Sequence, residues 1–136
     1  MVDGFVSDLD RSEKITINMS PVDLGQIDLL VREGFYSNRT DFIRTAIRVQ
    51  LATQAAAIER TVTRRTLVLG IQHFSRADLE QIRAAGETVR IRVLGLAVIA
   101  DDVPPELAAQ TIEEIEVLGA FRASPAVKAA IASRIV

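Results

Sequence analysis

The sequence predicts an α+β protein in two parts, and three observations support that prediction. Residues 14–19 alternate strictly between polar and apolar side chains, and two amphipathic helical patterns follow them. The tripeptide Val-Leu-Gly then recurs three times in the second half of the chain. Of the 136 residues, 49% are hydrophobic and 25% are charged, which is the balance of a folded chain and not of a disordered one.

The alternating segment is typical of a strand that buries one of its faces. Its apolar face holds Ile15, Ile17 and Met19. Its polar face holds Lys14, Thr16 and Asn18. A lone strand can neither pair its backbone groups nor bury its apolar face, so the sequence requires a second chain to supply a partner strand.

The two helices are predicted from their end signals. Ser20 suits the N-cap of the first helix, Pro21 suits its first position, and Gly34 suits the residue that ends it. Asn38 suits the N-cap of the second helix, which we expect to continue to about Glu59. The apolar stripe of this second helix consists of Phe42, Ile43, Ala46, Ile47 and Leu51.

Residues 12–55 resemble the ribbon-helix-helix (CopG/Arc/MetJ-like) family of bacterial DNA-binding regulators. The resemblance depends on the alternating strand, the Ser-Pro helix start, the Gly-aromatic turn and the segment SNRTDFIRTAIR. It implies an intertwined dimer over residues 13–60, in which two strands form an antiparallel ribbon that enters the major groove. Residues 1–12 would then be a flexible acidic arm in front of this domain.

The resemblance also implies roles for individual residues. It implies that the bases are read by Lys14, Thr16 and Asn18, whose side chains suit guanine, a thymine methyl group and adenine. It implies phosphate binding by Ser37, Asn38 and Arg39 at a helix N-terminus. It implies a dimer core of Ile15, Ile17, Met19, Phe42, Ile43 and Ile47. The alternatives are an ordinary exposed strand face and, at Asn38, simple helix capping.

The second half of the chain is predicted to be a repeat. Val-Leu-Gly occupies residues 68–70, 93–95 and 117–119, at spacings of 25 and 24 residues. Each copy ends a strand-like segment and precedes a loop and a helix-like segment. This period predicts a small three-rung β-α repeat, similar to a β-solenoid, with right-wound rungs and parallel strands in register.

The predicted register makes a specific statement about charged residues. Arg90 would neighbour Glu114, and Arg92 would neighbour Glu116, on one exposed face of the strands. Residues 61–66 would be a polar connector. We expect the module over residues 64–136, which we assign to no family, to mediate oligomerisation or to bind a partner or effector.

An alternative for this module is the βαββαβ regulatory domain of the nickel-responsive members of the same family. That domain needs several His and Cys ligands, whereas this chain has no Cys and the single His73. We therefore expect no metal, no cofactor and no catalytic residue, and the sequence contains neither a Gly-rich phosphate loop nor a Ser-His-Asp set. No apolar run approaches a membrane span and no export signal is visible, so we expect a cytoplasmic protein.

These patterns together predict a dimeric transcriptional regulator, a repressor, that binds a palindromic or repeated operator in double-stranded DNA. Residues 11–65 hold nine Lys and Arg against six Asp and Glu, although the whole chain has a net charge of −2. One alternative is an antitoxin that binds a toxin and regulates its own operon. Another is a scaffold protein that oligomerises through residues 64–136.

Overall fold

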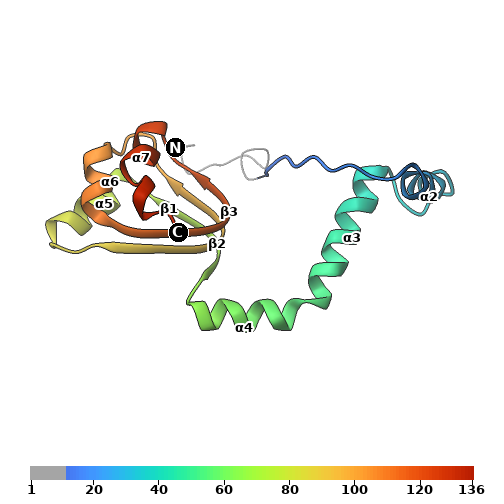
Figure 1. Cartoon of the computed structure of the whole chain (residues 1–136), viewed down its shortest axis with the longest axis horizontal. Helices are drawn as coiled ribbons and strands as arrows, with labels where there is room; N and C mark the ends of the chain where they lie inside the picture. The colour runs from blue at the N-terminus through green and yellow to red at the C-terminus, as the bar shows by residue number, and fades with distance from the viewer. Residues whose placement is uncertain (1–11) are drawn as a thin grey trace. The chain divides into compact units, whose positions relative to one another are not determined.

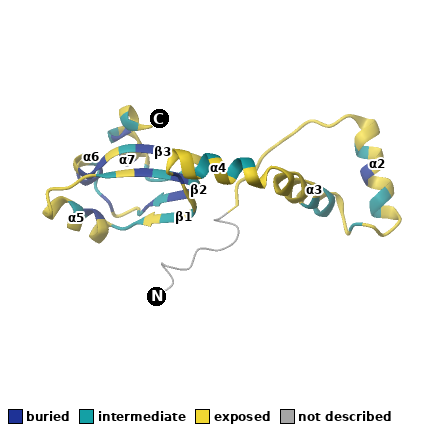
Figure 2. Ribbon diagram, turned by 90° about the horizontal axis from the view of Figure 1, so that it is seen from below, coloured by how far each residue is buried: buried dark blue, intermediate teal, exposed yellow. Residues whose placement is uncertain are grey.

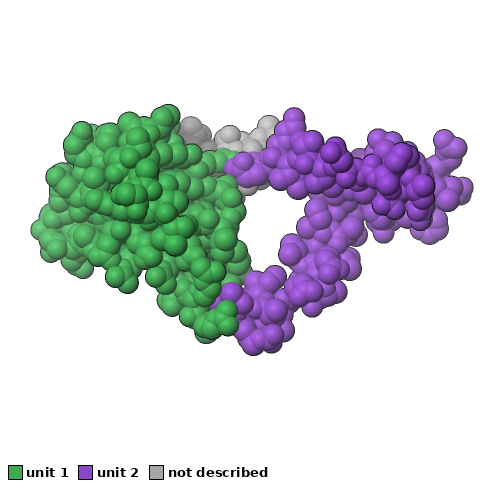
Figure 3. Space-filling view, in the orientation of Figure 1, with its two compact units in different colours: residues 1–11, 62–136 green, residues 12–61 purple. Residues whose placement is uncertain are grey.

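The computed structural model describes residues 12–136, so the predicted acidic arm lies, except for Ser12, outside the described residues. The described chain contains both helices and strands, which confirms the α+β class (Figure 1). It divides into two compact units, residues 12–61 and residues 62–136 (Figure 3). None of the helices in the described chain combines the length and the hydropathy that a membrane crossing requires.

The first helix of residues 12–61 begins and ends as the sequence predicts. Helix α2 (Pro21–Arg32) has Ser20 as its N-cap, whose Oγ accepts a 3.2 Å hydrogen bond from the Asp23 amide. After Arg32 the chain reaches Gly34, whose φ is +85°, a conformation that favours glycine. The Gly34 amide donates to the Val31 carbonyl at 3.1 Å, so the glycine closes the end of the helix.

The second predicted helix is divided into two. Helix α3 (Arg39–Thr53) begins after Asn38, but it ends before Gln54 instead of continuing to Glu59. The Gln54 amide donates to the Leu51 carbonyl at 3.0 Å, three residues back, which tightens the last turn. The residues around Gln54 have high helix propensity, so no local pattern indicated this interruption.

Helix α4 (Ala55–Arg65) then occupies most of the segment that we expected to be a polar connector. The expectation was wrong because polarity alone does not prevent a helix, and Arg64 and Arg65 suit the negative end of a helix dipole. The helix ends at Thr66, whose φ is +56°.

Residues 62–136 form one three-stranded parallel sheet with a helix after each strand (Figure 1). The strands are β1 (Val68–Phe74), β2 (Val89–Ile99) and β3 (Ile112–Arg122), in that spatial order. The elements that follow them are α5 (Arg76–Ala84), α6 (Pro105–Thr111), α7 (Pro125–Ala130) and the short 3-10 helix η2 (Ala132–Arg134). The alternating order differs from the βαββαβ alternative. The described residues form three repeats in one parallel sheet, and they do not show the predicted solenoid.

The predicted register is confirmed. Arg90 pairs with Glu114 and Arg92 with Glu116 in the ladder between β2 and β3. The ion pairs, however, are displaced from this register. Arg90 forms an ion pair with Glu113, and Arg92 forms one with Glu114 at 3.4 Å. The ladder is irregular at Val89 and Arg90, where β3 carries the extra residue Glu113 that Arg90 contacts. Glu116 forms its ion pair with Arg65.

The three glycines of the repeat also pair in register, Gly70 with Gly95 and Gly95 with Gly119. Each has a positive φ, of 131°, 142° and 122° in chain order. A Cβ atom on Gly119 would lie 2.1 Å from the carbonyl oxygen of Gly95. A close approach of neighbouring strands therefore requires glycine at positions 95 and 119, whereas at Gly70 the positive φ alone favours it.

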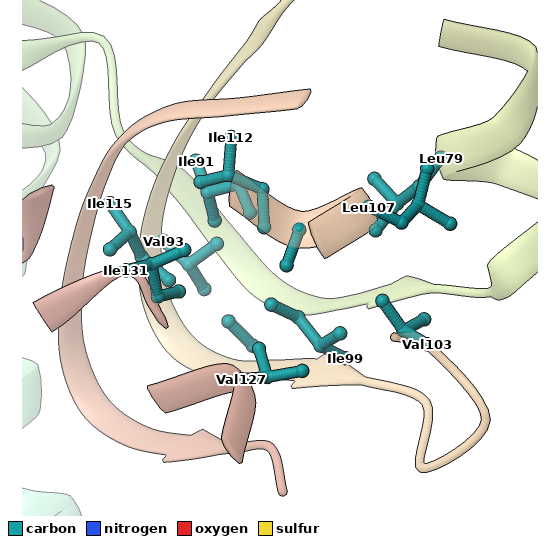
Figure 4. Packing of buried hydrophobic residues seen from close by; sticks show 12 residues of the cluster. Leu79, Ile91, Val93, Ile99, Val103, Leu107, Ile112, Ile115, Val127 and Ile131 are labelled. Carbon is teal, nitrogen blue, oxygen red and sulfur yellow. The ribbon is translucent and has the colours of Figure 1, made fainter. Parts of the chain in front are cut away.

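An aliphatic core lies between the sheet and the helices (Figure 4). It includes Ile91 and Val93 from β2, Leu79 from α5, Leu107 from α6 and Val127 from α7. Its other members are Ala97, Ile99, Val103, Ala108, Ile112, Ile115 and Ile131. This unit thus buries a core of its own within one chain.

Candidate nucleic-acid interface

The segment predicted as the ribbon is extended and forms no strand within the single chain. Its apolar residues face solvent, with Ile15 75% exposed and Ile17 61% exposed. The polar residues predicted to read the bases, Lys14, Thr16 and Asn18, are exposed as well. A strand requires a hydrogen-bonded neighbour, and no other segment of residues 12–136 supplies one.

Residues 12–61 bury almost nothing by themselves. Within this range Ile27, 4% exposed, is the one buried residue (Figure 2). Of the predicted dimer core in α3, Phe42 and Ile43 are half-buried and Ile47 is exposed. About fifty residues with one buried side chain lack the apolar burial that a stable fold needs. Within the single chain the predicted dimer-core side chains of this unit are therefore left without a buried core.

The predicted phosphate site lies at the start of α3. The Asn38 side-chain oxygen accepts a 2.8 Å hydrogen bond from the Asp41 amide, so Asn38 caps the helix. The Asp41 carboxylate in turn accepts a 2.9 Å hydrogen bond from the Ser37 amide. The capping alternative at Asn38 is thus observed. The two hydrogen bonds fix the backbone of Ser37 and Asn38 at the positive end of α3.

Arg39 makes a contact that the sequence analysis missed. Its Nε donates to Asp28 Oδ1 at 2.7 Å and its Nη2 to Asp28 Oδ2 at 2.8 Å, a bidentate pair that joins α3 to α2. The hydrogen bond from Arg39 lowers the pKa of Asp28, and the same hydrogen bond raises the pKa of Arg39. The two residues are eleven apart on different helices, so no local pattern pointed to the pair.

An aromatic contact orders the link between the two helices. The rings of Tyr36 and Phe42 meet edge to face, with centroids 5.0 Å apart and planes at 85°. Phe42 was singled out in the sequence for the dimer core, and its partner Tyr36 belongs to the Gly-aromatic turn. The contact sets the position of the α3 N-terminus within residues 12–61.

Within residues 12–136, His, Cys, Asp and Glu side chains nowhere gather in a group of three or more that could hold a metal ion. His73 lies exposed on β1. The candidate residues of this interface are the exposed polar side chains of residues 14–18 and the polar groups at the start of α3.

The chain matches the sequence profile of the Ribbon-Helix-Helix transcriptional regulator family over residues 10–128. It belongs to this family. The match extends well beyond residues 12–55, so the repeat that we assigned to no family falls within it for most of its length. Membership indicates a DNA-binding transcriptional regulator, and such regulators typically bind DNA as dimers. No curated protein and no solved structure matches the chain.

Proposed function

We propose that the protein is a homodimeric repressor of bacterial transcription that acts in the cytoplasm. Two chains each contribute residues 14–19 to an antiparallel ribbon, which enters the major groove of the operator. The single observation that carries this proposal is the state of residues 12–61: one buried residue, and an extended segment with an exposed apolar face. A second copy can pair with that segment and cover that face.

The polar face of the ribbon would carry Lys14, Thr16 and Asn18 from each of the two chains. Lys donates to guanine O6 and N7, Asn pairs with adenine through two hydrogen bonds, and Thr contacts a thymine methyl group or donates. The two-fold symmetry of the dimer requires a palindromic or repeated operator. All three side chains are exposed in the single chain, which the proposal requires.

The start of α3 would hold the DNA backbone on each side of the ribbon. The capped N-terminus of a fifteen-residue helix offers free amides and a partial positive charge to a phosphate. Arg39 uses two of the five N–H donors of a guanidinium for Asp28, so the others remain able to bind a phosphate oxygen. Asp28 would then hold the Arg39 side chain in position and leave its remaining N–H donors to the DNA phosphate.

The test is selection of bound DNA from a random pool, followed by binding assays with the selected site. Replacing Lys14, Thr16 and Asn18 together by Ala should abolish preference for that site and leave the dimer intact by light scattering. The matched control replaces Arg76 and Glu80, an exposed ion pair on α5, by Ala. Binding of the selected site that survives the triple change would refute reading by the ribbon.

The antitoxin alternative is less well supported. Residues 62–136 have their own core and sheet, whereas a toxin-binding tail is usually short and disordered by itself. A toxin that co-purifies with the chain would reverse this ranking. The scaffold alternative requires the repeat to add copies at both edges of its sheet.

A further inference from the structure

Strand β1 is an edge strand without the protection that such strands usually have. It pairs with β2 on one side, and on its other side no strand lies among residues 12–136. Its seven residues include no Lys, Arg, Asp, Glu or Pro. Charged side chains, prolines and covering segments normally protect such an edge from pairing with another chain. β1 is therefore open to strand addition.

The opposite edge of the sheet is covered in part by the same chain. Ile135 forms a parallel bridge with Ile115 of β3, and the Val136 amide donates to the Ile115 carbonyl at 2.9 Å. The Arg134 guanidinium donates to the Ile112 carbonyl at 2.8 Å, which fixes this C-terminal segment beside β3. The β3 edge is thus covered near Ile115, whereas no segment of residues 12–136 pairs with the outer side of β1.

The open edge is also apolar. Leu69 is 70% exposed and Ile71 is 53% exposed. Leu69 continues across the sheet into a row with Leu94, which is half-buried, and Leu118, which is exposed. Scattered exposed leucines are ordinary, but a row that continues from an unpaired edge marks an interaction surface.

We propose that β1 pairs antiparallel with β1 of a second copy of this chain, so that two sheets join across a two-fold axis. A second copy fits because β1 has no Lys, Arg, Asp or Glu, so pairing it with itself places no ammonium, guanidinium or carboxylate group against its like. Head-to-tail addition of β1 to β3 in the register of the repeat would place Leu69 beside Leu118, and it would leave one β1 and one β3 unpaired at the ends of every array. A two-fold pair uses the open edge of each copy and closes on itself.

The bounds of β1 fix the register of this pair. Antiparallel pairing of all seven residues from Val68 to Phe74 places the two-fold axis at Ile71. Ile71 then stands opposite Ile71 of the second copy, and Leu69 stands opposite its His73. The proposal concerns residues 62–136 and goes beyond DNA reading by the ribbon, so the two can fail separately.

A cysteine crosslink tests the register in the full-length protein. The chain has no Cys, so Ile71→Cys introduces one thiol that the proposed axis places beside its symmetry mate. The matched control is Leu118→Cys, an exposed leucine on the other edge strand. Oxidation should crosslink Ile71→Cys at least about tenfold faster, because pairing raises the effective thiol concentration toward the millimolar range.

Two other outcomes would overturn the proposal. Equal crosslinking of the two variants, or none of either, would show that the β1 edges do not meet. Faster crosslinking in a mixture of Leu69→Cys and Leu118→Cys chains would show head-to-tail addition instead. Adding the triple Ala change at Lys14, Thr16 and Asn18 to Ile71→Cys should leave the crosslinking rate unchanged, which separates this surface from DNA reading.

Hydrogen exchange provides a second measurement that depends on no thiol. In the unaltered protein the open side of β1 should be protected by the second copy. Ile71→Lys places two ammonium groups opposite each other at the axis, and like charges there oppose pairing. Exchange of β1 amides should then accelerate while that of β2 amides stays the same. Unchanged exchange in β1 would count against the pair.

Discussion

The carbonyl oxygen of Gly70 lies 2.1 Å from the position that a Cβ atom on residue Gly95 would take. Both residues have positive φ, so a side chain on Gly95 would add backbone strain to a collision with a neighbouring strand. We predict that Gly95→Ala lowers the free energy of unfolding of residues 62–136 by about 3 kcal/mol or more. Urea unfolding followed by circular dichroism would measure the loss.

Two other glycines provide controls for this prediction. Gly70 has a φ of +131°, but a Cβ atom there would meet nothing within 4 Å, so Gly70→Ala should show the strain without the collision and cost less. Gly25 lies inside α2, and a Cβ atom added there would meet nothing within 4 Å. Gly25→Ala should therefore stabilise that helix by roughly 0.5–1 kcal/mol. Equal losses at Gly95 and Gly70 would contradict the role given to the collision.

The same glycines explain why the sheet could be predicted from the sequence. A position whose positive φ favours glycine recurs once per repeat, so the period of Val-Leu-Gly carries the register of the strands. The ion pairs could not be predicted with equal success, because Arg90 contacts the extra residue Glu113 and Glu116 pairs with Arg65, although the register of Arg92 and Glu116 is correct. The period of a sequence repeat predicts the backbone register of the strands, whereas the pairing of their charged side chains also depends on local irregularities and on other neighbours.

The candidate site shows a similar division. Alternation in residues 14–19 predicted which side chains share a face, but pairing of that segment depends on a second chain. Caps such as Ser20 and Asn38 depend on nearby residues and were found at their predicted places. The pair of Arg39 and Asp28 depends on how two helices pack, which no local pattern contains.

Asp28 predicts a pH effect on residues 12–61. Its pKa is lowered in the folded chain, chiefly by the hydrogen bond from Arg39, so the ionised form stabilises the folded state. This contribution is present above the unfolded pKa of Asp, about 3.9, and is lost as the pH falls through the lower folded value. Unfolding measured between about pH 2 and pH 6 should therefore differ between the unaltered protein and Asp28→Asn, and the difference should vanish at the acid end. Because both side chains are about half exposed, the effect should be small and sensitive to salt.

Arg39 predicts a change in the salt dependence of DNA binding. If its remaining donors contact a phosphate, Arg39→Ala should weaken binding to specific and unrelated DNA by a similar factor. Each lost contact should reduce the slope of log K against log salt by about 0.9, and the dimer loses two. Fluorescence anisotropy at several salt concentrations would measure it. Arg76→Ala on α5 is the control and should leave the slope unchanged.

Asn18 predicts a change in specificity and not in the salt slope. If its amide pairs with adenine, Asn18→Ala should cost about 1–3 kcal/mol on the selected site for each symmetric contact. Binding to unrelated DNA should hardly change, because a neutral side chain neutralises no phosphate. Anisotropy titrations with the selected site and with one substituted at each position would locate the base. An equal loss of affinity for all DNA sequences would show that Asn18 contacts the DNA backbone instead.

Ile17 tests whether the exposed apolar face is the dimer core. It is 61% exposed in the single chain, so a polar residue there should not disturb the fold of one chain directly. In a ribbon dimer the Ile17 side chain of each of the two chains is buried, and each buried aliphatic side chain contributes roughly 1.5–3 kcal/mol to dimer stability. Ile17→Gln should therefore weaken dimer formation by residues 12–61 and, with it, DNA binding. The neighbouring Thr16→Gln, on the opposite face, should leave dimer formation unchanged even if it alters base reading. Sedimentation equilibrium measures the dimer dissociation constant of both variants. Equal dissociation constants for Ile17→Gln and Thr16→Gln would show that Ile17 is not part of the dimer core.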